Sequence, residues 1–154
     1  MVEYPDDLPY RGRLAGDGHR YALRIYYEDT DAGGVVYHAN YLRFFERARS
    51  DLLGLAGVDH VAAAAAGEGH YVVVEAALRY LAPARLGDAL VIVSQVELIR
   101  GSSCVIQQRV MRGGQLLVEG RLTVAYVDRN GRPRRQPRQW IEAFEAVKGA
   151  DIRA

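Results

Sequence analysis

Hydrophobic residues recur along this chain with two different periods. Between His38 and Ala56 the apolar positions lie three or four residues apart, a spacing that places them on one face of a helix. They are Tyr41, Phe45, Ala48, Leu52 and Leu55. Gly57 follows this segment and is typical of a left-handed helix cap. The chain is therefore expected to contain one long amphipathic helix.

The period is two on either side of that helix. Alternating apolar residues in segments rich in β-branched and aromatic side chains predict strands. The expected strands cover Tyr21–Tyr27, His70–Tyr80, 90–98, Cys104–Arg112 and 116–126. The glycine pair between the last two indicates a hairpin. Strands joined by hairpins form an antiparallel sheet, and one helix covers only one of its faces. The fold class is therefore α+β, with about five strands.

The chain is expected to form a single domain. Its 154 residues suffice for one hydrophobic core but not for two. Residues 1–19 carry Pro, Gly and Asp without an apolar run, so we interpret them as a flexible leader. The domain is expected to span 20–147, ending in a short helix within Gln136–Val147, and 148–154 are expected to form a tail.

Composition and charge narrow the range of functions. Twenty basic residues against 19 acidic ones leave a net charge of +1, so no overall field favours nucleic acid. The single cysteine, Cys104, excludes an intrachain disulfide and a cysteine-rich metal site. No apolar run approaches the roughly 20 residues of a membrane-spanning helix, and residues 1–20 do not resemble a signal peptide. We expect a cytoplasmic protein.

Acidic side chains are concentrated between the first strand and the helix. Glu28, Asp29 and Asp31 lie within four positions of one another, followed by two glycines and the start of the helix. Unpaired amides at a helix N-terminus favour negative charge and stabilise the oxyanion of acyl transfer. A nearby carboxylate serves as nucleophile or as base for water. These residues suit the hydrolysis of an ester or thioester.

This segment resembles the active-site motif of the 4-hydroxybenzoyl-CoA thioesterase-like family, which has the hotdog fold. The matching residues are Tyr27-Glu-Asp-Thr-Asp-Ala-Gly-Gly-Val-Val-Tyr-His-Ala-Asn-Tyr-Leu42 and Phe45-Glu-Arg-Ala-Arg49. They are most similar to the acyl-CoA thioesterase branch associated with the Tol-Pal system of the cell envelope, over roughly residues 21–137. The resemblance implies an antiparallel sheet wrapped around one long central helix.

The resemblance also implies site residues. Asp31 matches the catalytic aspartate, which is a nucleophile or general base in the family. His38 stands at the start of the helix, where its N–H would polarise the thioester carbonyl, and its imidazole is a further candidate contact. Gly34 and Tyr37 are candidate pocket residues. The resemblance implies no metal and no other cofactor.

Proteins of this family bind CoA at an interface between subunits, so a homodimer or homotetramer is expected. Arg132, Arg134 and Arg135 form the densest basic cluster and are candidates for contacting the CoA phosphates. Arg100, which precedes a glycine-containing turn, is a second candidate. An acyl carrier protein is a further candidate partner.

Several of these residues also have structural interpretations. Asp29 is expected to support the turn, and the acidic trio is an alternative site for a hard cation. Glu46 and Arg49 stand three apart on the helix and suggest an ion pair. Because another branch of the superfamily uses a helix glutamate catalytically, Glu46 is also a reserve candidate. The basic cluster is alternatively a solvated loop.

The sequence thus predicts an acyl-CoA thioesterase that releases a free acid and CoA, with Asp31 at its centre. One alternative is a non-catalytic protein that binds acyl-CoA or an acyl carrier protein, or a scaffold at the cell-envelope machinery. A second is a hydratase or dehydratase of the same fold, which the motif over 27–42 disfavours.

Overall fold

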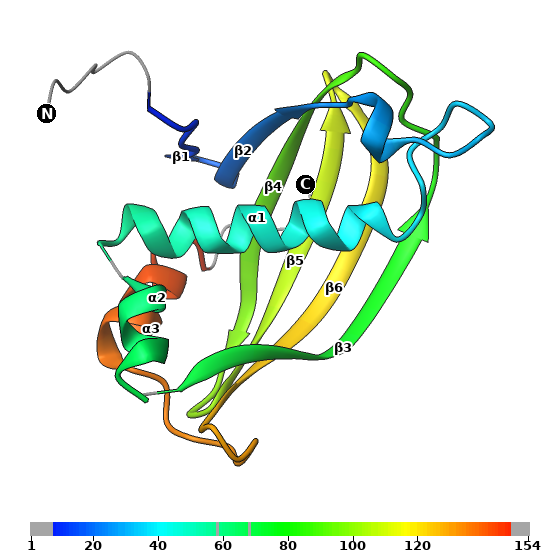
Figure 1. Cartoon of the computed structure of the whole chain (residues 1–154). Helices are drawn as coiled ribbons and strands as arrows, with labels where there is room; N and C mark the ends of the chain where they lie inside the picture. The colour runs from blue at the N-terminus through cyan, green and yellow to red at the C-terminus, as the bar shows by residue number, and fades with distance from the viewer. Residues whose placement is uncertain (1–7, 58, 68, 149–154) are drawn as a thin grey trace, which may run out of the picture.

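An antiparallel sheet of six strands curves around one long helix (Figure 1). This computed structural model describes residues 8–57, 59–67 and 69–148. The strands are β1 Arg13–Ala15, β2 Gly18–Arg24, β3 His70–Tyr80, β4 Ala89–Ile99, β5 Ser103–Arg112 and β6 Gln115–Val127. The helices are α1 Asn40–Leu55, α2 His60–Ala65 and α3 Arg138–Glu145, and a 3-10 helix covers Tyr27–Asp29. The α+β class is confirmed.

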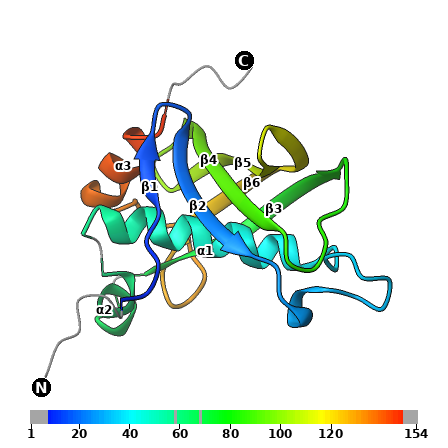
Figure 2. The same ribbon diagram turned by 90° about the horizontal axis from the view of Figure 1, so that it is seen from above.

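The sheet order is β1-β2-β4-β5-β6-β3, which makes the long strand β3 an edge. Its pairing with β6 joins His70 to Val127 at one end and Tyr80 to Val118 at the other. The helix α1 lies along the concave side of the sheet, and Figure 2 shows it crossing below β2. The start of α1 and the end of β3 therefore lie at one end of the molecule, and α2 and α3 at the other.

The predicted periodicity of α1 is confirmed with two differences. Tyr41, Phe45, Ala48 and Leu52 are buried as expected, and Gly57 has the left-handed φ of +77°. Phe44 is buried as well, whereas Leu55 is 37% exposed. Burial of an aromatic or leucine side chain contributes about 1.5–3 kcal/mol, so this face holds the helix on the sheet.

The buried side chains form two clusters, one along each half of α1. The first surrounds the start of the helix and contains Ile25, Val36, Tyr41, Phe44, Phe45, Leu90, Ile92, Leu117 and Leu122. The second surrounds its end and contains Leu52, Leu53, Ile106, Val124, Tyr126, Trp140 and Phe144. The helix α3 supplies the last two of these residues, so the expected terminal helix closes the second cluster.

Strand β1 was not predicted, and it lies inside the segment expected to be a flexible leader. It pairs with β2, with Leu14 opposite His19. The N–H of Gly12 donates to the Asp51 carboxylate on α1 at 2.9 Å, so this segment is also tied to the helix. Residues 1–7 of the expected leader and 149–154 of the expected tail lie outside the described residues.

A buried histidine lies beneath this contact. His19 is completely buried, and its Nε2 lies 2.6 Å from Asp51 Oδ2. Burial lowers the pKa of His19 below its usual 6.5, although the neighbouring carboxylate acts in the opposite direction. The lowered pKa favours the neutral imidazole, and because a carboxylate oxygen only accepts, Nε2–H is the donor to Asp51. Over the residues that the structure describes, no helix is long and apolar enough to cross a membrane.

Candidate active site

Asp31 opens a tight turn between the 3-10 helix and α1. Its backbone N–H donates to Val35 O at 2.9 Å, and its carbonyl accepts from Gly34 N at 3.1 Å. Its side-chain Oδ1 accepts from Gly33 N at 2.8 Å. A φ of +80° at Gly34 completes the turn. The turn thus holds one carboxylate oxygen of Asp31 in place, and the side chain remains exposed to solvent.

Helix α1 begins close by without a side-chain cap. Its N-cap residue is Ala39, which has no side-chain oxygen to accept from the first amides. Within the described part of the chain, the amides of His38 and Ala39 donate to no backbone carbonyl. The positive end of the helix dipole and these N–H groups therefore lie close to the Asp31 loop, and such a helix end attracts an anionic oxygen.

The end of β3 fixes the position of this helix start. The Tyr80 hydroxyl donates to His38 O at 3.0 Å, and the His38 ring packs edge-on against the rings of Tyr37 and Tyr80. The loop after β3 holds the other side, because Val36 N donates to Ala84 O at 2.8 Å.

Asp31 and His38 line one pocket of about 350 Å³. The other lining residues are Val35, Val36, Tyr41, Tyr80, Leu81, Ala82 and Pro83. Burial raises the pKa of Tyr41, so its hydroxyl stays neutral in this wall. The pocket combines Asp31, a residue directly before the helix start and apolar walls, an arrangement suited to the hydrolysis of an acyl group.

The other predicted residues near the loop have different positions. Gly34 and Tyr37 do not line this pocket; Gly34 shapes the turn and Tyr37 is 47% exposed beside His38. Asp29 is buried, and its Oδ2 accepts from Tyr26 N at 2.8 Å, as expected for a structural role. Its carbonyl accepts from Tyr37 N and from the Asn40 side chain.

The structure separates the basic cluster from Asp31 within one chain. Arg132, Arg134 and Arg135 are exposed on the loop after β6, at the end where β3 begins (orange in Figure 1). Asp31 lies near the opposite end of β3, on the order of 30 Å away along an 11-residue strand. Arg100 lies at the same end as the cluster, because its carbonyl accepts from Gln136 Nε2.

Glu46 lies away from Asp31, in a second pocket farther along α1. Its carboxylate accepts from the Ser50 hydroxyl at 2.7 Å. The ion pair expected between Glu46 and Arg49 is wrong, because Arg49 bonds to Gln108 instead and forms no salt bridge with a described residue.

The residues after the end of β3 were not predicted as part of the site. Tyr80 appeared in the sequence only as a member of an alternating strand, and residues 81–83 carried no signal at all. Their position depends on the pairing of β3 with β6, which places the strand's end beside the helix start. The motif located the loop and the helix, but not the wall that faces them.

The family of this chain follows from comparison with known proteins. Residues 26–149 match the family model described as the thioesterase-like superfamily. The chain belongs to this superfamily. The match covers the Asp31 turn, α1, and the four strands and two helices that follow α1, so the resemblance expected from the motif is confirmed.

Curated relatives within the superfamily match over nearly their whole length. An acyl-CoA thioesterase, YbgC, of Haemophilus influenzae is 37% identical over 136 residues, which are 88% of this chain and 100% of the relative. An acyl-CoA thioester hydrolase, YbgC, of Escherichia coli is 41% identical, over 82% of this chain and 95% of the relative.

Solved structures show the same fold. A probable thioesterase from Bartonella henselae has a TM-score of 0.74 at 34% identity, covering 77% of this chain and 98% of that one. A protein from Thermus thermophilus has a TM-score of 0.75 at 30% identity, covering 83% and 98%. The expected hotdog fold of this thioesterase-like protein is confirmed, with six strands rather than about five.

Proposed function

We propose that this protein hydrolyses acyl-CoA thioesters to a carboxylic acid and free CoA. One observation carries the proposal: Asp31 and His38, which stands just before the uncapped start of α1, line the same pocket. The relatives named as acyl-CoA thioester hydrolases support the same reaction.

In this mechanism the thioester carbonyl lies between Asp31 and the helix start. Asp31 attacks the carbonyl carbon or removes a proton from an attacking water, and the oxygen gains negative charge. The N–H groups of His38 and Ala39 stabilise that charge, after which the C–S bond breaks. If water is the nucleophile, Asp31 passes the proton it removed to the sulfur, and the acid and the CoA thiol leave. If Asp31 is the nucleophile, CoA leaves as the thiolate, and a water then hydrolyses the acyl-aspartyl anhydride to release the acid and supplies the proton that the thiolate takes up. The bond from Gly33 N to Oδ1 orients the carboxylate and leaves Oδ2, which has no partner among the described residues, for this chemistry.

The decisive experiment compares Asp31→Asn with Glu28→Gln. Asn retains an oxygen that accepts from Gly33 N, so the turn is preserved while the charge is lost. Glu28 is an exposed carboxylate three positions earlier and serves as the matched control. With a panel of short, long and aromatic acyl-CoAs, we expect Asp31→Asn to lose about 10²–10⁴-fold in kcat and Glu28→Gln to keep normal turnover.

Release of the CoA thiol is a suitable readout for this assay. Cys104 is buried and its pKa is raised to about 11, so the folded protein adds little to the thiol signal. Normal turnover by folded Asp31→Asn would exclude the mechanism. Binding of acyl-CoA without turnover by the unmodified protein would instead favour the non-catalytic alternative.

We also propose a homodimer joined through β3. This strand has 11 residues, pairs only with β6 and exposes Val73 and Val74 by 47% and 60%. A long apolar edge of this kind is a template for pairing with another strand. Two copies related by a two-fold axis would pair β3 antiparallel, which joins the two sheets.

This pairing supports the predicted role of the basic cluster. In an antiparallel β3 pair, the His70 end of one copy lies near the Tyr80 end of the other. The loop with Arg132, Arg134 and Arg135 of one copy would then approach the Asp31 pocket of its partner and contact the CoA phosphates. None of these three arginines has an ion-pair partner among the described residues.

The family resemblance alone supports three further proposals: a cytoplasmic location, a function associated with the Tol-Pal system, and acyl carrier protein as an alternative thioester carrier. The last is tested by comparing hydrolysis of one acyl group on CoA and on the carrier protein. Equal kcat/KM would support the carrier protein as a substrate, and turnover of the CoA thioester alone would exclude it.

A further inference from the structure

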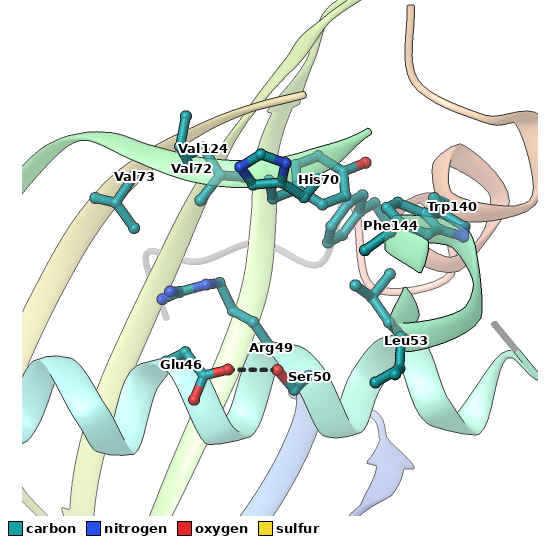
Figure 3. Close-up of a pocket in the computed structure, with 13 residues that line it drawn as sticks. Glu46, Arg49, Ser50, Leu53, His70, Val72, Val73, Val124, Trp140 and Phe144 are labelled. Atoms are coloured by element: carbon teal, nitrogen blue, oxygen red, sulfur yellow. Dashed lines mark hydrogen bonds between the residues drawn. The ribbon is translucent and has the colours of Figure 1, made fainter. Parts of the chain in front are cut away.

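A second pocket of about 390 Å³ lies between the C-terminal half of α1 and the first residues of β3 (Figure 3). Its walls are mostly apolar and include Leu53, Val61, Val72, Trp140 and Phe144. The volume lies in the lower part of the range for small-molecule sites, which is about 300–1,000 Å³. The pocket therefore suits a small ligand with an apolar body.

Arg49 places a positive charge in this apolar pocket. Figure 3 shows its side chain extending from α1 into the space below Val72 and Val73. Burial lowers the pKa of Arg49, but a guanidinium stays charged at physiological pH. Within the described part of the chain, no carboxylate lies within salt-bridge distance of it. The nearby Glu46 carboxylate favours the charge of Arg49 without bonding to it, so a bound anion would add the direct contact that this half-buried cation lacks.

A network of hydrogen bonds fixes the guanidinium in this position. Arg49 Nη1 donates to Gln108 Oε1 at 2.9 Å. Gln108 is itself fully buried, and its Nε2 donates to Phe45 O and to Ser94 Oγ. A guanidinium has five N–H donors, and one of them bonds to a described residue, so donors remain for a ligand.

The neighbouring carboxylate of Glu46 does not bond to the guanidinium of Arg49. Glu46 bonds to Ser50, and Figure 3 shows that pair on the helix side, with the guanidinium extending toward β3. The carboxylate of Glu46 is exposed, so its repulsion of a second anion is screened by solvent.

We propose that this pocket binds carboxylates with an apolar tail, and that Arg49 holds the carboxylate group. The tail lies against Leu53, Trp140 and Phe144. Two sources supply this chemistry: a free acid from solution, or an acyl group whose far end carries a carboxylate. We include the second source because, in the proposed dimer, the partner's Asp31 pocket lies beside this end of β3, so the acyl tail of a substrate held there would extend into this pocket.

Trp140 reports occupancy of the pocket directly, because it is the single tryptophan of the chain. We expect octanoate to change its fluorescence saturably and to bind about 10-fold more tightly than octanamide, its uncharged isostere. This titration does not depend on the proposed hydrolysis. Equal affinity of the two compounds, or no saturable change with octanoate, would overturn the proposal.

The variants Arg49→Gln and Arg47→Gln test whether the preference for octanoate over octanamide depends on the charge of Arg49. Gln at position 49 keeps a donor for Gln108 but loses the charge, so the preference for octanoate should disappear. Arg47 is exposed two positions away, and its variant should keep the preference. A folded Arg49→Gln protein that retains the preference would refute the role of Arg49. If that variant does not fold, the comparison of the two ligands on the unmodified protein decides.

A second experiment, which rests on the proposed hydrolysis, distinguishes a free acid from an acyl group that carries a terminal carboxylate. Turnover of octanoyl-CoA is compared with that of the thioester whose tail ends in a second carboxylate. A lower KM for the carboxylated substrate, lost in Arg49→Gln, supports the acyl tail as the natural occupant. Equal KM values together with tight octanoate binding support a free acid.

Discussion

Two aspartates two positions apart, Asp29 and Asp31, differ in burial and in their hydrogen bonds. Asp29 is buried and its carboxylate is used by Tyr26 N, whereas Asp31 is exposed and keeps one oxygen free beside the helix start. The sequence motif pointed to Asp31 and to a structural Asp29. It provided no means to find Tyr80, because that contact joins residues 42 positions apart and depends on the sheet.

The structural role of Asp29 predicts a difference between two substitutions. Asp29→Ala leaves the amide of Tyr26 without its acceptor, which should cost about 1–3 kcal/mol of unfolding free energy. Asp29→Asn keeps an acceptor oxygen and should be close to neutral. Urea unfolding of both variants measures the difference, and an Ala variant as stable as the unmodified protein would contradict this role.

His19 predicts a loss of stability in mild acid. Because burial lowers its folded-state pKa below 6.5, the unfolded chain binds a proton at a higher pH than the folded chain does. The stabilisation is therefore complete above pH 6.5 and declines as the pH falls toward the folded-state pKa. Replacement by Gln, which does not titrate, should reduce the dependence of the unfolding free energy on pH below 6.5. The same slope in both proteins would exclude His19 as the cause.

At the level of elements, periodicity predicted the helices and strands that bury one face repeatedly. It missed the short elements that are held by a few individual contacts. The helix α1 buries the same face over four turns, so its pattern was clear. Strand β1 has only three residues, Arg13–Ala15, and is held by its pairing with β2 and the nearby bond from Gly12 to Asp51. Neither contact produces a repeat in the sequence.

The packing of α1 on β6 predicts sensitivity to one methyl group. A Cβ at Gly120 would lie 2.7 Å from Phe45 Cε2, and that ring is fully buried. We expect Gly120→Ala to cost about 1–3 kcal/mol in unfolding free energy. Gly114 in the β5–β6 hairpin is the control, since nothing lies within 4 Å of its added Cβ. Equal melting temperatures for the two variants would contradict this prediction, because they would show that the sheet moves to accommodate the added methyl group.

On the scale of the whole molecule, β3 exposes apolar side chains that the sequence pattern predicted to be buried. The alternation of β3 predicted a buried face, yet Val74 and Tyr80 are 60% and 51% exposed in a single chain. A sequence pattern does not specify which chain covers an apolar residue. Burial against a second copy would account for these exposed positions.

The β3 edge therefore predicts the effect of a charge on assembly. Val74→Lys should convert a species of at least twice the 17.1 kDa chain mass into a monomer, because an unpaired ammonium is excluded from a strand interface. Leu86→Lys, on the loop before β4, changes a residue of 44% exposure away from β3 and should leave the mass unchanged. Light scattering after size exclusion measures both, and an unchanged mass for Val74→Lys would place the interface elsewhere.

The order of elements also determines when the apolar face of α1 is first covered. The ribosome completes this helix before β4, β5 and β6, and at about 5–20 residues per second several seconds pass before Val127 is added. During that interval the strands that cover Tyr41, Phe45 and Leu52 are incomplete, and β6 is the last to be added. Nascent chains that stop before Gln115 are therefore expected to aggregate or to be retained by chaperones, and chains that reach β6 to become soluble.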